Sequence, residues 1–260
     1  GCYIKFKEEN IMVVQHNLSA MNTNRQMGVV TSALQKSTEK LSSGYKINRA
    51  GDDAAGLSIS EKMRSQIRGL NKASSNAQDG ISAIQTAEGA LNEAHSILQR
   101  MNELATQSAN DTNTTADRTA VQSEVNALTN ELSRIASTSQ FNTQNLLDGT
   151  FTGKNLQVGA LENQKITISI GTMNAKALGV DSLDVKSFTK AGAAMTLIQK
   201  AISKVSGQRS DLGALQNRLE HTVNNLDNIS ENTQTAESRI RDTDMASEMV
   251  QYSATSIIQQ

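Results

Sequence analysis

The sequence predicts a mainly α-helical protein, with long antiparallel helices in a coiled-coil-like bundle and a small β-hairpin region. Three observations predict this fold class. The 260 residues include no proline, so the strongest helix breaker is missing throughout. Aromatic residues make up only 3% of the chain, whereas aromatic side chains usually dominate a compact globular core. Apolar residues recur with a period close to seven, which is the repeat of paired helices.

The first residues differ in character from the rest of the chain, and Met12 has the features of a natural start. The stretch that ends at Met12 can be back-translated into a string with GGAGG shortly before ATG, as in a bacterial ribosome-binding site. We therefore expect residues 1–11 to be a non-native upstream extension; a genuine short extension is the alternative. Met12-Val13-Val14 is followed at once by polar residues, so we expect no cleavable secretory signal.

The first two helices are expected on either side of a glycine-containing break. Residues 12–45 carry one apolar line at seven-residue spacing, which is interrupted at Ser42-Ser43-Gly44. Asp52 and Asp53 then offer helix N-caps, because a carboxylate accepts hydrogen bonds from the free N–H groups of a first turn. The second helix should run to about Asn110. Its apolar line consists of Met63, Leu70, Ala77, Ile84, Leu91, Leu98 and Ala105.

The second half of the chain begins with a polar turn at 110–114, and a third helix is expected from about Ala116 to Ile135. Between Phe141 and Val185 the glycines and the alternation Ile166-Thr167-Ile168-Ser169-Ile170 indicate short strands in hairpins. From Ala193 the helical period returns. Its apolar line consists of Ile198, Val205, Leu212, Leu219, Leu226, Thr233 and Ile240.

Such long seven-residue repeats favour coiled-coil pairing with a left-handed supercoil, although long solvent-facing helices of other bundles carry the same stripe. The middle of the chain has enough apolar residues to fold alone. The ends, 12–45 and 243–260, have only each other and neighbouring subunits. Ordering the backbone costs about 1–2 kcal/mol per residue. We therefore expect both ends to be disordered in the free monomer and helical after assembly.

The sequence offers no candidate catalytic residue, cofactor site or metal site, so we expect no enzyme activity. The single cysteine has no neighbouring residues that would complete a metal site with it, and the three histidines are scattered: His16, His95 and His221. The carboxylate pairs Asp52/Asp53 and Asp242/Asp244 lie near helix breaks, where capping is the simpler role. The net charge is −1, with no Lys/Arg run and no apolar stretch of about 20 residues. Neither nucleic-acid binding nor membrane insertion is therefore expected.

Several segments together resemble bacterial flagellin. The most specific is Leu41–Leu57, which reads LSSGYKINRAGDDAAGL. The other matching segments are Asn76–Ile81, Gln85–Leu91, Gln99–Asn110, Leu212–His221 and Ala236–Ala246. Longer flagellins insert outer domains before the C-terminal helix, and the short stretch Gly171–Gly192 leaves no room for one. The resemblance therefore implies a minimal flagellin.

The resemblance also implies how the chain works. The ends, 12–45 and 243–260, would form the inner layer of a homopolymeric filament, and 46–242, with hairpins at about 141–185, the filament core domain around it. It implies unfolded export through the flagellar type III apparatus with an export chaperone, and assembly under the filament cap into the extracellular flagellum that drives swimming. Absence of proline suits such export, because slow isomerisation is avoided. Flagellins usually continue beyond 257–259, so we expect the C-terminal helix to be truncated.

Flagellins of many bacteria are also ligands of Toll-like receptor 5, and the matching contact positions here are Arg100, Leu104 and Glu124. Arg100 and Leu104 are four residues apart, so a flat receptor surface could reach both on one helix face. The alternative is that Arg100 and Glu124 only contact other subunits. Two rival functions also fit helices of this kind. One is a hook-filament junction protein that shares the terminal coiled coil, and the other is a cytoplasmic coiled-coil adaptor.

Overall fold

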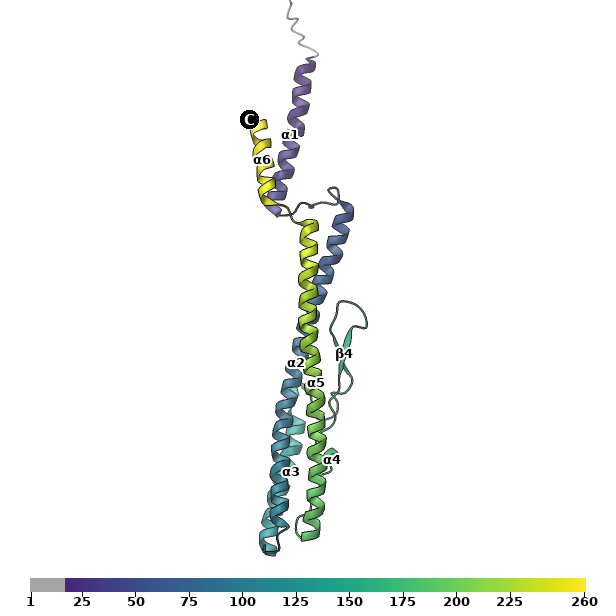
Figure 1. The fold of residues 1–260 in the computed structure, drawn as a ribbon, viewed down its shortest axis with the longest axis vertical. Coiled ribbons are helices and arrows are strands. Elements are labelled where there is room, and N and C mark those ends of the chain that lie inside the picture. The colour runs from purple at the N-terminus through teal and green to yellow at the C-terminus, as the bar shows by residue number, and fades with distance from the viewer. Residues whose placement is uncertain (1–16) are drawn as a thin grey trace, which may run out of the picture. The chain divides into compact units, whose positions relative to one another are not determined.

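The computed structural model describes residues 17–260, and the expected extension at 1–11 lies outside them, as does His16 (Figure 1). Its helices are α1 (Leu18–Ser43), α2 (Ala54–Ser108), α3 (Thr115–Thr138), α4 (Ala175–Leu178), α5 (Phe188–Arg241) and α6 (Met245–Gln259). Its antiparallel hairpins pair β1 (Gln140–Phe141) with β2 (Gln144–Asn145) and β3 (Lys154–Gln157) with β4 (Lys165–Ile168). The predicted fold class is confirmed.

The chain divides into two compact units. The middle unit is Ser65–Thr233, and the end unit combines 17–64 with Gln234–Gln260. Both boundaries fall inside long helices, α2 and α5, which each contribute to both units. The predicted filament layers have other boundaries, at 45/46 and 242/243; they concern the assembled state and stay a prediction.

The predicted apolar seam forms part of the core of the middle unit. All members of the α2 line from Leu70 to Ala105 are buried, and so are all members of the α5 line from Ile198 to Leu226. The Ser74 hydroxyl donates to Asp227 Oδ1 (3.0 Å), and the Ser230 hydroxyl donates to Asn71 Oδ1 (2.7 Å). Residue numbers rise along one helix as they fall along the other, so these parts of α2 and α5 are antiparallel.

Helix α3 completes this core from a capped start. The Thr114 hydroxyl accepts from the Asp117 N–H, and the Asp117 carboxylate accepts from the Thr114 N–H, which forms a capping box. Further along α3, the buried Gln122 donates to the Leu183 carbonyl and accepts from the Val185 N–H, both at 2.8 Å. One side chain thus satisfies two backbone groups of the segment that leads into α5.

The hairpin region confirms the alternating pattern and corrects its end. Ile166, Ile168 and Ile170 are buried, as the alternation predicts. Strands are predicted as far as Val185, and this is wrong beyond Ile168, because the next regular element is α4. Helix α4 begins at an Asn174 cap, whose Oδ1 accepts from the Ala177 N–H at 2.8 Å. Four residues make barely one turn, too few for a helical period to show in sequence.

The end unit is built around α1 and α6, which pack against each other (Figure 1). Helix α1 stops at Gly44, whose φ of +77° is the left-handed conformation that glycine adopts without strain. Helix α6 starts at an Asp244 cap, which accepts from the Ala246 and Ser247 N–H groups. Within residues 17–260 no helix is both long enough and apolar enough to cross a membrane.

The seam predicts a large stability effect for Leu91→Ala. Leu91 is fully buried on the α2 line, so its truncation should lower the free energy of unfolding by about 2–5 kcal/mol through lost burial and a residual cavity. Urea unfolding followed by circular dichroism measures this change. The matched control is Gln85→Ala on the exposed face of α2, which should stay within about 0.5 kcal/mol of the parent.

Candidate functional site

The α1–α6 pair presents apolar side chains to solvent. On α1 the exposed large residues are Leu18, Met21, Met27 and Val29. On α6 they are Met245, Met249, Val250, Ile257 and Ile258, of which Val250 is 71% and Ile257 73% exposed. Full burial of one such side chain is worth about 1.5–3 kcal/mol. The two helices therefore carry a large apolar surface that one chain leaves in water.

Correspondingly, few side chains of this helix pair are buried. Across α1 and α6, both wholly described, the only buried side chains are Ser37 and Glu248. Glu248 is 7% exposed, and its Oε2 lies 3.5 Å from Lys40 Nζ, while Oε1 has no partner among the described residues. A buried carboxylate costs free energy unless it is paired. Beside this long ion pair, apolar side chains such as Leu34, Leu41 and Tyr252 are only half-buried.

A compact joint ties the α1–α2 link to the end of α5 inside the end unit. Tyr45 forms a β-bridge with Asp242, and the Lys46 N–H donates to the Arg241 carbonyl at 2.8 Å. The Arg241 guanidinium lies 4.5 Å from the centre of the Tyr45 ring and 3.1 Å from Glu61 Oε1. Cation–π and ionic contacts at one side chain therefore hold both ends of the chain together.

The two aspartates of the GDDAAG segment have different roles, which corrects the prediction that both cap a helix. Asp53 is the cap of α2, because its Oδ1 accepts from the Gly56 N–H at 2.8 Å. A methyl group at Gly56 would overlap that carboxylate, so glycine is needed there. Asp52 instead accepts from the N–H groups of Arg49 (3.0 Å) and Asn48 (3.2 Å). These bonds, helped by the positive charges of Lys36 and Arg49, hold the Asp52 pKa below its ordinary value.

The predicted receptor residues lie in the middle unit, and the structure brings two of the three together at the surface. Arg100 Nε and Nη2 lie 3.1 and 2.9 Å from Glu124 Oε1, and Nη1 lies 3.2 Å from Glu103 Oε2. The Glu124 bond, followed by the Glu103 bond, raises the Arg100 pKa above its ordinary value. Arg100 and Glu124 thus form an exposed charge pair that joins α2 to α3.

Leu104 does not share this surface. It is 1% exposed and belongs to the core of the middle unit. The prediction that a flat surface could reach both Arg100 and Leu104 is therefore wrong for Leu104. Spacing by four places two residues on one side of a helix, but here that side is covered by the rest of the middle unit. Leu104 packs in the core beneath the helix surface that carries Arg100.

No group of side chains that could hold a metal ion appears in the part of the chain that the structure describes. No group of three or more His, Cys, Asp or Glu side chains gathers within residues 17–260. His95 Nε2 lies 3.0 Å from Gln99 Nε2 on the same helix. His221 lines an open groove of about 620 Å³ beside the loop that links β3 and β4, and no carboxylate lines this groove. The geometry therefore points to surfaces rather than to a cavity.

Comparison with known families identifies the family of the chain that carries these surfaces. The family model for the bacterial flagellin N-terminal helical region matches residues 14–152, and the model for the C-terminal helical region matches 195–260. The chain belongs to the bacterial flagellin family. This is a family of structural proteins, and both matched regions contain the long helices described above.

Relatives of this family match along nearly the whole chain. A flagellin of Halalkalibacterium halodurans is 55% identical over 251 residues, which cover 96% of this chain and 92% of that protein. The flagellar filament 31.3 kDa core protein of Treponema maltophilum is 50% identical over 265 residues (96% and 93%). A flagellin of Bacillus subtilis is 48% identical over 284 residues (96% and 93%).

Solved structures agree with the fold. The crystal structure of Bacillus cereus flagellin superposes with a TM-score of 0.52 at 31% identity, over 58% of this chain and 88% of that one. A Vibrio parahaemolyticus chain described as a flagellar hook-associated protein superposes with a TM-score of 0.63 at 14% identity, over 74% and 100%. The second match concerns the fold alone.

Two features of the end unit were not predicted from sequence: the Lys40–Glu248 pair and the contact of Arg241 with Tyr45. The signal for the first is present, since Glu248 is the one charged residue of α6. The second joins residues nearly two hundred positions apart, for which one sequence holds no signal. It became visible only once the helices were placed.

The Asp52 turn predicts a sharp acid response. Because its folded pKa is lowered, Asp52 contributes stability that is present above its unfolded pKa and lost as pH falls through the folded pKa. Amide hydrogen exchange at Asn48 and Arg49 should therefore accelerate, relative to the intrinsic rate, as pH falls through that range. In Asp52→Asn, whose amide oxygen can accept but does not titrate there, this acid-dependent step should disappear. A step retained in Asp52→Asn would exclude Asp52 as its source.

Proposed function

We propose that the chain polymerises into a flagellar filament through its end unit. As a flagellin it is a structural subunit, and the observation that carries the proposal is the lack of any buried apolar side chain in the α1–α6 pair. Helices with exposed leucine, isoleucine, valine and methionine and no fully buried apolar side chain gain most of their burial from neighbouring copies. The segments 12–45 and 243–260 then form the inner filament layer, and 46–242 forms the filament core domain around it.

This proposal includes the state of the ends before assembly. Ordering the α1 and α6 backbones costs about 1–2 kcal/mol per residue, and the contacts within one chain offset little of that cost. In a dilute monomer the ends are therefore disordered, and they become helical as neighbouring copies cover them. The middle unit has its own buried seam and stays folded in both states.

The same proposal extends to export and place of action. The chain leaves the cell unfolded through the flagellar type III apparatus, accompanied by an export chaperone, and adds under the filament cap to an extracellular flagellum used for swimming. A chain without proline and with one cysteine supports this route, because neither slow isomerisation nor an internal disulfide hinders threading. Recovery of the protein from sheared filaments rather than from the cell interior tests it.

The rival functions have less support. A cytoplasmic coiled-coil adaptor would not be expected to match flagellins at about half identity over 96% of the chain. The hook-associated neighbour shares only the fold, at 14% identity. Electron microscopy of a deletion strain, with the amount of filament protein measured alongside, separates the remaining pair. Both functions leave hooks without filaments in the deletion strain. Loss of the filament protein itself supports the filament subunit, whereas bare hooks despite normal amounts of filament protein support a junction protein.

The assembly proposal predicts that Val250→Asp abolishes polymerisation. Val250 is highly exposed on α6, and a carboxylate there would have to be desolvated without a partner in an apolar subunit contact. Light scattering and electron microscopy should show no filaments, while urea unfolding of the middle unit stays unchanged. Gln251→Asp, also exposed on α6, is the matched control and should polymerise. Filaments of normal yield from Val250→Asp would contradict the proposal.

We also propose that the Arg100–Glu124 surface binds Toll-like receptor 5. Support comes from the resemblance to flagellins and from the exposure of both charged side chains on adjacent helices. Arg100 and Glu124 make the contact, and Leu104 holds their helices in place from within the core. The same surface remains available for contacts with other subunits, so receptor binding and assembly compete.

The receptor proposal predicts that Arg100→Ala weakens binding of the receptor ectodomain by about 10–100-fold, as removal of a central charged contact often does. Surface plasmon resonance with the monomer measures the effect. Arg134→Ala is the matched control, because Arg134 forms a similar exposed pair with Glu131 on α3. Equal binding by Arg100→Ala and the parent would remove the assignment while leaving the filament proposal intact.

A further inference from the structure

We propose that the exposed methionines of the end unit form a site of reversible oxidation that controls assembly. The four side chains are Met21, Met27, Met245 and Met249. In the free chain, a peroxide converts them to sulfoxides and thereby blocks polymerisation; in the polymer, neighbouring copies cover them. The inference rests on the proposed assembly through α1 and α6.

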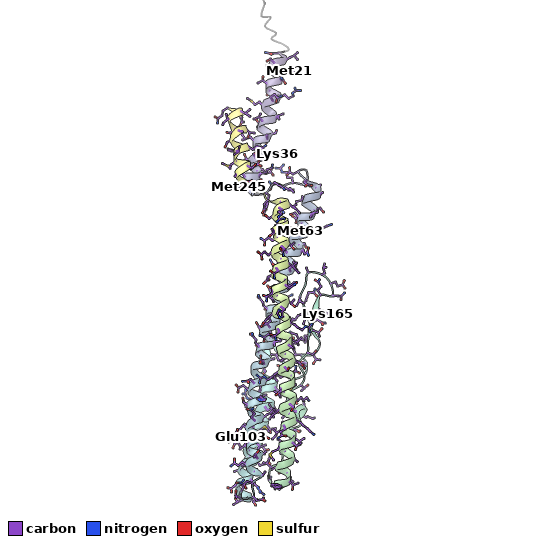
Figure 2. All side chains as sticks on the ribbon, viewed as in Figure 1. Met21, Lys36, Met63, Glu103, Lys165 and Met245 are labelled. Carbon is purple, nitrogen blue, oxygen red and sulfur yellow. The ribbon has the colours of Figure 1, made fainter. Side chains whose placement is uncertain are left out.

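The observation behind it is the distribution of methionine over the two units. The chain has nine methionines, of which Met12 lies outside the described residues. The exposed ones are all on α1 and α6: Met21 (65%), Met27 (52%), Met249 (50%) and Met245 (47%). Figure 2 labels Met21 on α1 and Met245 at the start of α6.

The remaining methionines are shielded. Met101 and Met173 are buried in the core of the middle unit. Met63 and Met195 are half-buried, and Met195 Sδ accepts a hydrogen bond from the Thr106 hydroxyl at 3.3 Å. Access to a dissolved oxidant therefore differs most strongly between the assembly helices and the rest of the described chain.

The chemistry needs only a two-electron oxidant such as hydrogen peroxide. One oxygen atom is transferred to the thioether sulfur, the peroxide O–O bond breaks, and water is released. The sulfur loses two electrons to become a sulfoxide, and the peroxide gains them. No neighbouring base or metal is required, so exposure of the sulfur decides which methionines react. Methionine sulfoxide reductases reverse the step, one enzyme for each sulfoxide epimer.

The product is poorly suited to the proposed contact. A sulfoxide is a polar acceptor, and burial against apolar side chains leaves it without a donor. Met21 lies three residues from the exposed Leu18 on one helix face, and Met249 is next to Val250. Oxidation thus puts polar groups into the same apolar surface that assembly would bury. The core methionines keep their thioethers, so the middle unit keeps its fold.

The test uses the full chain treated with hydrogen peroxide as monomer or as polymer, with peptide mass spectrometry to locate each sulfoxide. The four exposed methionines should oxidise at least tenfold faster in the monomer than in the polymer. The critical concentration for polymerisation should rise at least tenfold after oxidation, which corresponds to about 1.4 kcal/mol. Treatment with both reductases should restore the original value.

Two variants sharpen the test. Replacement of all four residues by leucine should give a chain whose polymerisation no longer responds to peroxide. The matched variant Met63→Leu with Met195→Leu keeps the four exposed methionines and should stay sensitive. If the quadruple variant assembles poorly, the comparison of oxidised and reductase-treated parent chain still decides.

The outcomes are separable. If the untreated chain fails to polymerise, the proposed function is overturned and the inference with it. If untreated and fully oxidised chains polymerise alike, the inference alone is overturned. Equal oxidation rates in monomer and polymer, or sensitivity that persists in the quadruple leucine variant, would also overturn it.

Discussion

Burial of one apolar seam between antiparallel helices is the interaction on which the rest of this structure depends. Residues such as Ile84 and Leu91 on α2, and Val205 and Leu212 on α5, repeat at seven and are withdrawn from water along the middle unit. Leucine and isoleucine alone would tolerate a slip by one heptad. The polar pair of Ser74 with Asp227 would not, because a slip by seven residues places Ile67 or Ile81, which offer no hydrogen-bond donor, opposite the Asp227 carboxylate. The register is therefore held by hydrogen bonds, and the stability by burial.

The end unit has the opposite arrangement. Along α1 and α6 the large apolar side chains are exposed or only half-buried, and the contact between the two helices holds the long Lys40–Glu248 ion pair, which contributes little net stability. The contacts of Arg241 with Tyr45 and Glu61 hold the α1–α2 link and the start of α2 beside the end of α5. The difference between the two units agrees with the proposed assembly, in which the middle unit folds by itself and the end unit is completed by neighbouring copies.

Both proposed functions of this chain use surfaces rather than a pocket. The Arg100–Glu124 charge pair on α2 and α3 is exposed, and apolar side chains are exposed along α1 and α6. Neither requires a cofactor or a strained side chain. The one proposed reaction is oxidation of the exposed methionine thioethers. The exposure that the proposed assembly requires also makes these side chains accessible to an oxidant. Assembly and oxidation then compete for one set of side chains.

The sequence by itself determined the long helices, the seam and the family. Spacing by seven identified the buried lines of α2 and α5, alternation identified the inward side of β4, and Gly44 and the pair Asp52-Asp53 indicated where helices stop and start. Only the tertiary structure showed which residues are buried or bonded through contacts with a further element of the fold. Leu104 lies off the seven-residue line and is nevertheless buried, because α2 packs against more than one partner and a single stripe marks only one seam. Likewise Gln122 and Arg241 gain their roles from groups far away in sequence, and periodicity carries no information about such contacts.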